Sequence, residues 1–352
     1  MTFLIVLSHE TQYIAGEYWF EVLNTPISTN YLFVTVSGIW GQVAVAGFVV
    51  ITAYFTCDKD YVHYVKIEKL WLQAFSTFII LEVFAYFFRP SQYDGVMKGI
   101  LKGLVSPVNS TWWYLTGYIF LFLFIPVLQR FIKSAEQNLF RKVLLCLLAV
   151  TLVGDFVNLR AGGSVVDFVL LYLLTAYIKK YFNEKFTIRA RRVNICCSLI
   201  LIAAILVVRA MGYVNPGFLK LLDRVFVNWN IFIMLAAVSI FYCFRDMKIS
   251  YGTNVIRYLS SLTFGIYLLH ENRFTGPWLW NETFHLDKAY ESVFFPVKYL
   301  LAATLVFIVS ALIEAIRKVL ITDSLTTRWS SWINGRAINF VNSMRNYWTQ
   351  QP

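Results

Sequence analysis

The amino-acid sequence predicts an all-α protein, a polytopic integral-membrane bundle of about ten transmembrane helices. Composition is the first reason: 58% of the 352 residues are hydrophobic and only 14% are charged, whereas soluble domains carry ~25% charged residues. The second reason is that the hydrophobic residues form blocks of roughly 20 residues, the length that crosses a bilayer. Third, Trp, Tyr and Phe make up 18% of the chain, and aromatic rings collect at membrane interfaces. A soluble globular protein is therefore excluded.

The hydrophobic blocks, read in windows of ~20 residues, give a series of complete spans. They cover residues 34–56, 70–88, 112–132, 142–159, 165–183, 193–209, 228–244, 255–270 and 295–316. A further segment, residues 1–17, starts at Met1 and is too short to cross a hydrocarbon core of ~30 Å as a helix. We therefore expect the first span to lack its beginning.

The distribution of Lys and Arg predicts the orientation, because these residues are retained on the cytoplasmic side of short loops. If the first segment runs outward, the inner loops hold 21 of the 31 Lys and Arg and the outer loops hold 10. Both termini are then cytoplasmic, and this topology accounts for the net charge of +11. Because the basic residues are not gathered on one solvated face, we expect no nucleic-acid partner.

The chain divides into a membrane domain, residues 1–317, and a cytoplasmic tail, residues 318–352, which has a loosely amphipathic pattern. Residues 94–105 place aliphatic side chains on one face and two lysines opposite, which is typical of a short interfacial helix. The five cysteines form no CxxC pair and have no histidine at ligand spacing, so we expect no metal site.

Ionisable side chains inside the spans are the candidates for chemistry, because each costs at least ~2.5 kcal/mol at membrane depth. His9 and Glu10 lie in the first segment, and His270 and Glu271 close a later one. A histidine can act as a general base near neutral pH, and an adjacent carboxylate can orient it or stabilise its charged form. The alternative is that each histidine only packs between helices, hydrogen-bonded to a neighbouring carbonyl.

Two lysines are candidates for binding an anionic ligand. Lys66 and Lys69 lie three residues apart at the inner end of the span at 70–88, so they share one helical face. Two ammonium groups at a cytoplasmic opening could hold the phosphates of a nucleotide-like ligand. Ordinary positive-inside charge explains them equally well.

Four segments then suggest a family. They are FLIVLSH (Phe3–His9), GQVAVAGFVVITAYF (Gly41–Phe55), WWYLTGYIFLFLFIPVL (Trp112–Leu128) and LTFGIYLLHE (Leu262–Glu271), with weaker support from FVLLYLLTAYIKKY (Phe168–Tyr181). Together, and in this order, they resemble the integral-membrane acyltransferase family 3, bacterial proteins that O-acetylate surface polysaccharides. The first segment resembles the family's span that ends in a catalytic histidine, and the fourth its late span that ends in Ile-Tyr-Leu-x-His.

The resemblance implies transfer of an acyl group, most simply acetyl, across the inner membrane. Acyl-CoA is the co-substrate from the cytoplasm, the acceptor is a hydroxyl of a polysaccharide or glycolipid, and no cofactor is permanently bound. His9 matches the histidine that activates the acceptor hydroxyl, with Glu10 beside it. Lys66 and Lys69 match the family's basic pair, usually Arg-x-x-Arg, at the donor entrance.

The resemblance also suggests an acceptor side for the site. His270 matches the late-span histidine, and with Glu271 and the pair Trp112 and Trp113 it is expected to face the acceptor. In this interpretation no residue is expected to bind a metal ion.

Three departures from the family pattern stand out. The family carries an arginine or lysine eleven residues before the histidine, a position that falls before Met1. It has Asp or Asn where this chain has Ala46, and Ser-Gly where this chain has Thr52 and Ala53. Thr52 still offers a hydroxyl, whereas the change to Ala46 removes a polar group.

Two rival interpretations follow. A polysaccharide exporter or polymerase-like transporter would also be polytopic and rich in aromatic residues, and an acyltransferase paralogue could have lost its activity. No GxSxG, P-loop, HExxH or dinucleotide-binding motif occurs in the chain, so serine-acyl, NTP-driven and zinc mechanisms have no basis in the sequence.

Overall fold

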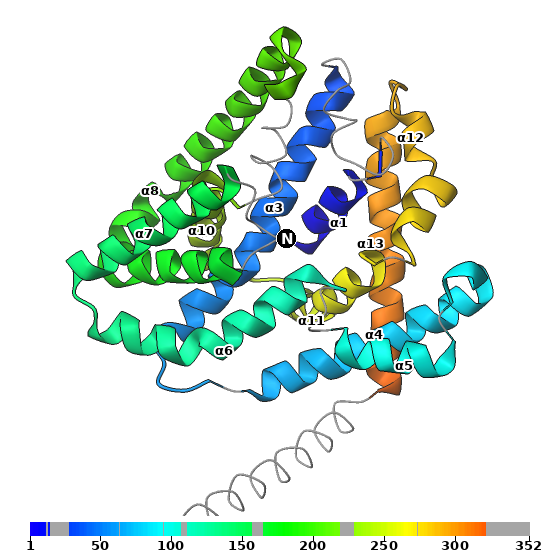
Figure 1. Ribbon diagram of the computed structural model, residues 1–352, viewed down its shortest axis with the longest axis horizontal. Coiled ribbons are helices and arrows are strands. Elements are labelled where there is room, and N and C mark those ends of the chain that lie inside the picture. The colour runs from blue at the N-terminus through cyan, green and yellow to red at the C-terminus, as the bar shows by residue number, and fades with distance from the viewer. Residues whose placement is uncertain are drawn as a thin grey trace, which may run out of the picture.

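The computed structural model describes residues 1–11, 13–14, 28–62, 64–93, 95–106, 111–156, 165–218, 229–272 and 274–321. All regular secondary structure in these ranges is helical, and no strand occurs among them (Figure 1). The predicted all-α class is therefore confirmed.

The helices follow the hydrophobic blocks of the sequence closely. The longer ones are α3 (Thr29–Thr56), α4 (Val65–Phe88), α6 (Trp113–Ser134), α7 (Gln137–Phe156), α8 (Val165–Val214), α10 (Ile231–Arg245), α11 (Thr253–His270) and α13 (Phe295–Leu320). The shorter ones are α1 (Thr2–Thr11), α5 (Val96–Val105), α12 (Leu286–Ala289), η1 (Pro90–Gln92), η2 (Pro216–Phe218) and η3 (Trp278–Thr283). The predicted interfacial segment 94–105 thus forms a helix, α5, whereas most of the predicted tail lies outside the described residues.

Within the described residues, 5 helices are long and apolar enough to cross a membrane, namely α3, α4, α6, α8 and α13. Helix α8 corrects one expectation, because two spans were predicted at 165–183 and 193–209 with a polar loop between them. The structure has one helix of 50 residues over this region. Residues 184–192 contain neither Pro nor Gly, so nothing in the charged middle stops the helix.

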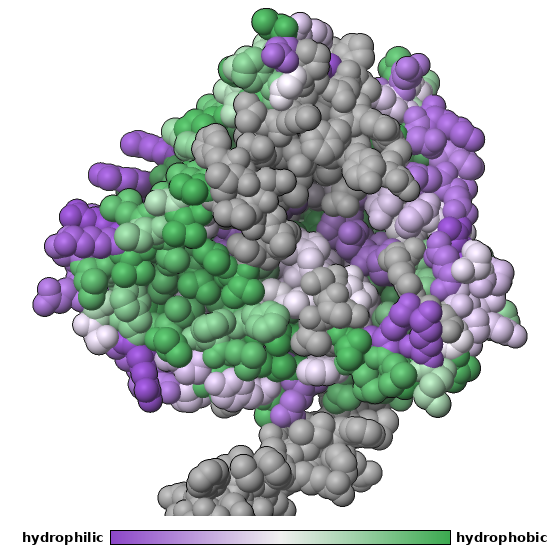
Figure 2. Space-filling model, in the orientation of Figure 1, coloured by the Kyte–Doolittle hydropathy of each residue, from purple (hydrophilic) through white to green (hydrophobic). Residues whose placement is uncertain are grey.

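The outer surface of α6 and α7 is strongly apolar. Figure 2 shows hydrophobic side chains gathered over these two helices, with hydrophilic side chains toward the edge of the molecule. On α7, Leu145 and Val150 are 58% and 59% exposed, and on α6 Val127 is 64% exposed. Such a surface would be unfavourable in water but matches lipid chains, which are as apolar as these residues.

Helix α1 lies inside the bundle, packed against α3, α11 and α13 (Figure 1). Its approach to α3 is very close, because a Cβ added to Gly41 would lie 1.9 Å from the Cβ of Ser8. The Ser8 hydroxyl donates to the carbonyl of Gly38 at 3.3 Å, and the Tyr299 hydroxyl on α13 donates to the carbonyl of Leu7. These contacts fix the residue that follows, His9.

Candidate functional site

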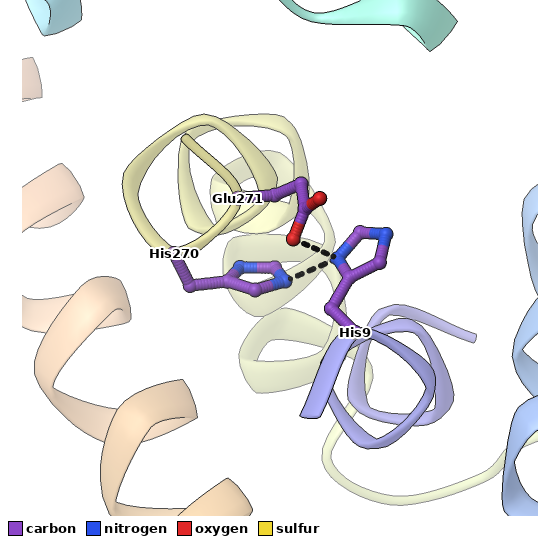
Figure 3. A group of neighbouring side chains, drawn as sticks. All are labelled: His9, His270 and Glu271. Carbon is purple, nitrogen blue, oxygen red and sulfur yellow. Dashed lines mark hydrogen bonds and ion pairs between the residues drawn. The ribbon is translucent and has the colours of Figure 1, made fainter. Parts of the chain in front are cut away.

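The two predicted histidines are in direct contact, although 261 residues separate them in the sequence. Nδ1 of His9, from α1, lies 2.9 Å from Nε2 of His270, from the end of α11 (Figure 3). The same Nδ1 lies 3.2 Å from Oε2 of Glu271. Both histidines are buried, His9 at 4% and His270 at 0% exposure. Packing of α1 against α11 therefore creates a polar cluster inside an apolar bundle.

The contacts of His270 determine which ring nitrogens carry protons. Nδ1 of His270 lies 2.6 Å from the carbonyl oxygen of Ile266, and a carbonyl only accepts, so this nitrogen donates. In the neutral ring, Nε2 of His270 is then the acceptor, and Nδ1 of His9 must donate to it. This leaves Nε2 of His9 with its lone pair. Figure 3 shows that this second nitrogen faces away from His270 and Glu271.

The carboxylate that contacts His9 is Glu271 and not its sequence neighbour Glu10. Glu10 is 0% exposed, and within the described residues neither of its oxygens has a hydrogen-bond partner. Adjacent residues on a helix point about 100° apart, so Glu10 and His9 present different faces of α1. Of the two carboxylates expected near the histidines, only Glu271 joins the cluster.

A cavity of about 380 Å³ extends from His9 to the two predicted lysines. It is bounded by five helices, and most of its lining is apolar or aromatic, as is usual for sites that bind small molecules. The lining residues are Thr2, Ile5 and His9 of α1, Val45, Phe48, Ile51 and Thr52 of α3, Lys66, Lys69, Leu70 and Gln73 of α4, Trp113, Tyr114, Leu115 and Tyr118 of α6, and Thr263, Phe264 and Tyr267 of α11.

The two ends of this cavity differ in solvent exposure. Lys66 and Lys69 are exposed, and neither has an ion pair within the described part of the chain. His9 at the other end is buried. The structure thus brings the histidine and the lysine pair to one cavity, an arrangement that could accommodate a ligand with a charged outer part and an apolar inner part.

The two predicted tryptophans lie in different environments. Trp113 lines the cavity, whereas Trp112 is 1% exposed and packs in a core cluster with Phe78 and Phe274.

At the positions that depart from the family pattern, Ala46 is buried and Thr52 lines the cavity. The Thr52 hydroxyl donates to the carbonyl of Phe48 and lies 3.0 Å from the hydroxyl of Tyr118.

His9, His270 and Glu271 also form a group that could hold a metal ion, since one ligand atom from each lies within 4.8 Å of the others. No spacing in the sequence indicates this group, because the two histidines lie far apart along the chain. In the arrangement described, Nδ1 of His9 donates to His270, and a nitrogen that binds a metal would have to give up this hydrogen bond because a ligand needs a free lone pair.

Sequence reasoning missed Tyr267 and Gln73. The Tyr267 ring lies 6.0 Å from that of His9, measured between centroids, and both residues line the cavity. Tyr267 is three residues before His270 and Gln73 is four after Lys69. Helical spacing from the residues already selected would have found both.

Comparison with known families gives one match. The family model described as an acyltransferase domain, of the acyltransferase 3 type, matches residues 2–315. No curated protein and no solved structure matches the chain. The family match includes both histidines, the lysine pair and all the helices that line the cavity. The chain therefore belongs to the acyltransferase 3 family and is a multi-pass membrane acyltransferase.

Proposed function

We propose that this protein transfers an acyl group, acetyl in the simplest case, from acyl-CoA to a hydroxyl of a cell-surface or lipid-linked polysaccharide. The observation that carries the proposal is the cavity, which joins a buried histidine with a free ring nitrogen to a pair of exposed lysines. An acyl-CoA has matching ends, an anionic nucleotide and an uncharged thioester.

The donor binds with its phosphates at Lys66 and Lys69 and with its thioester toward His9. Ammonium groups bind phosphate oxygens through charge-assisted hydrogen bonds, and both lysines lack a competing ion pair among the described residues. The aromatic and aliphatic lining of the inner cavity suits the acyl chain, and apolar walls disfavour water next to the thioester, which limits its hydrolysis.

The chemical step uses His9 as general base. As the acceptor hydroxyl oxygen attacks the thioester carbonyl carbon, Nε2 of His9 takes the hydroxyl proton. The new C–O bond forms, the C–S bond breaks, and the same proton passes from Nε2 to the leaving thiolate, which gives the ester and free CoA. His270 accepts the hydrogen bond from Nδ1–H of His9 throughout, with the Glu271 carboxylate beside it, as the orienting residue does in other histidine-based sites.

The reaction runs across the inner membrane of the cell. We propose ten spans with both termini cytoplasmic, a membrane unit of residues 1–317 and a cytoplasmic tail of residues 318–352. Counting ten spans treats the two apolar halves of the continuous helix α8 as separate membrane segments, with its charged middle at the cytoplasmic surface. On this topology the lysine end of the cavity faces the cytoplasmic donor, and the acceptor approaches His270, Glu271 and Trp113 from outside.

The proposal is tested with radiolabelled acetyl-CoA and membrane vesicles that contain the protein and its native glycan. Inverted vesicles expose the cytoplasmic face, so they should incorporate label into glycan, whereas sealed right-side-out vesicles should not, because acetyl-CoA does not cross the bilayer. Inverted vesicles with His9→Ala should incorporate almost none. Incorporation that does not depend on His9 would contradict the mechanism, and its complete absence in the wild type would favour an exporter or an inactive paralogue.

Topology is tested separately by introducing single cysteines at residues 185 and 285 after replacement of the five native cysteines. An impermeant thiol reagent should label position 285 from outside the cell and position 185 only after the membrane is opened. The reverse result would overturn the orientation.

A further inference from the structure

The side-chain amide of Gln73 is held in one orientation. Its Nε2 lies 2.9 Å from Oε1 of Glu314 on α13. A carboxylate oxygen only accepts, so the NH₂ end of the amide must face Glu314 and the carbonyl end must face the other way. The carbonyl oxygen of Gln73 accepts no hydrogen bond from the described residues, and Gln73 lines the cavity.

Glu314 is itself fixed by a buried ion pair. Arg317 donates to both of its oxygens at 2.6 Å, through Nε and through one terminal nitrogen, and Glu314 is 0% exposed. A two-pronged pair of this kind restricts geometry as well as adding energy. The other terminal nitrogen of Arg317 lies 3.3 Å from the Ser76 hydroxyl on α4, so the ion pair is tied to the helix that carries Gln73.

A glycine on α11 makes room for this arrangement. A Cβ added to Gly265 would lie 2.2 Å from Oε2 of Glu314, so no larger residue fits while the carboxylate stays in place. Three helices therefore cooperate to orient one amide: α11 by leaving space, α13 by supplying the ion pair and α4 by carrying Gln73.

Gln73 continues the row of polar cavity residues on α4. Lys66, Lys69 and Gln73 are spaced three and four residues apart, so they follow one face of the helix, and all three line the cavity. At a rise of 1.5 Å per residue, Gln73 lies about 10 Å further along the helix axis than Lys66. If the phosphates of an acyl-CoA bind at the lysines, its pantetheine arm extends along this part of the cavity toward Gln73. The arm contains two amide groups.

We infer that Gln73 is a donor-binding residue, whose carbonyl accepts a hydrogen bond from an amide N–H of the pantetheine arm, and that Glu314, Arg317 and Gly265 position it. This inference rests on the proposed function. Gln73 then distinguishes a thioester that carries an amide from one that does not. When the amide is missing, the Gln73 carbonyl has no hydrogen-bond donor in the apolar cavity, and this lowers the affinity for such a donor.

The test compares three acetyl donors in inverted vesicles. Acetyl-CoA has phosphates and amides, S-acetylpantetheine has only the amides, and S-ethyl thioacetate has neither. Gln73→Leu should lower kcat/KM about three- to tenfold for the first two donors, mainly through KM, which corresponds to one neutral hydrogen bond. It should leave S-ethyl thioacetate unchanged. Replacement of Lys66 and Lys69 by Gln should affect acetyl-CoA alone.

Gln129→Leu is the matched control, because Gln129 is a buried glutamine on α6 that donates to the Thr56 carbonyl and lies outside the cavity lining. It should not change the ranking of the donors. Gln73→Met, which keeps side-chain length, repeats the test if Gln73→Leu accumulates poorly. The wild type provides a further test of the inference, because its kcat/KM must be higher for S-acetylpantetheine than for S-ethyl thioacetate.

The outcomes separate this inference from the proposed function. If the wild type transfers acetyl from acetyl-CoA but the Gln73 variants keep its donor ranking, the inference is wrong and the proposed function stands. Equal use of the amide-bearing and amide-free donors by the wild type overturns it as well. If the wild type uses none of the three donors, both fail together.

Discussion

The two ends of the cavity are built in opposite ways. At the inner end, His9 lines the cavity and contacts His270 and Glu271, which lie far away in the sequence, and hydrogen bonds fix the two histidine rings. At the outer end, Lys66 and Lys69 are neighbours on one helix, both exposed and both without an ion pair in the described part of the chain. The inner end therefore depends on tertiary packing and suits a step that needs exact proton positions. At the outer end only the positive charge of the lysines is required, and attraction between charges does not depend on an exact side-chain position.

The largest expected effect is at the inner end. Replacing His9 by Ala removes the general base, and such groups contribute typically ~10² to 10⁴ in rate. We expect kcat to fall by that factor while the KM for acetyl-CoA stays close to that of the wild type. Radiolabel incorporation in inverted vesicles measures it. His285→Gln, at an exposed histidine outside the cavity lining, serves as the control.

A smaller effect is expected for His270, which orients His9 without taking the proton from the acceptor. His270→Ala removes one hydrogen-bond acceptor from Nδ1 of His9, a loss of ~1–3 kcal/mol that corresponds to roughly a 5- to 150-fold lower kcat. His270→Gln retains an acceptor and should recover part of this loss. If KM rises while kcat is unchanged, or if Gln is no better than Ala, His270 does not position His9.

Substitutions at the outer end should raise the KM for acetyl-CoA about tenfold and leave kcat unchanged. Charge-assisted contacts to phosphate are strong, but at an exposed site they are screened by salt. Replacing Lys66 and Lys69 together by Gln should raise the KM for acetyl-CoA, and the difference from the wild type should shrink at high salt. The control replaces Lys142 and Lys185 by Gln, since both are exposed and neither lines the cavity. An equal change in the control would mean that the effect is general surface charge.

The same contrast explains what the sequence could predict. The helices and the Lys66–Lys69 pair depend on local pattern, so hydropathy and helical spacing found them. The contact between His9 and His270 spans 261 residues. Both histidines were candidates because they are ionisable residues within apolar spans, but no local pattern could show that they meet. The carboxylate in contact with His9 is Glu271 and not its neighbour Glu10, because sequence adjacency does not give a shared helix face. Hydropathy also divided α8 in two, since a charged stretch lowers the average without ending a helix.

The smallest effect that still sharpens the comparison lies between the two ends, at Gly265. Gly265→Ala should displace Glu314, whose oxygens are held by Arg317 and Gln73, and such overpacking costs ~1–3 kcal/mol of stability. We expect a rise of a few fold in the KM for acetyl-CoA and little change in kcat. Gly103→Ala is the control: its Cβ would lie 3.1 Å from Phe78, a looser fit away from the ion pair.

The decisive form of this experiment combines the two substitutions. If Gly265→Ala acts on the donor only by turning the Gln73 amide, it should have no further effect on KM in a Gln73→Leu background, because residues that act through one contact are not additive. Independent, additive effects would show that α11 touches the donor by another route, through Thr263, Phe264 or Tyr267, which also line the cavity. In that case the middle of the cavity would resemble its outer end, with several loosely coupled contacts, instead of its tightly ordered inner end.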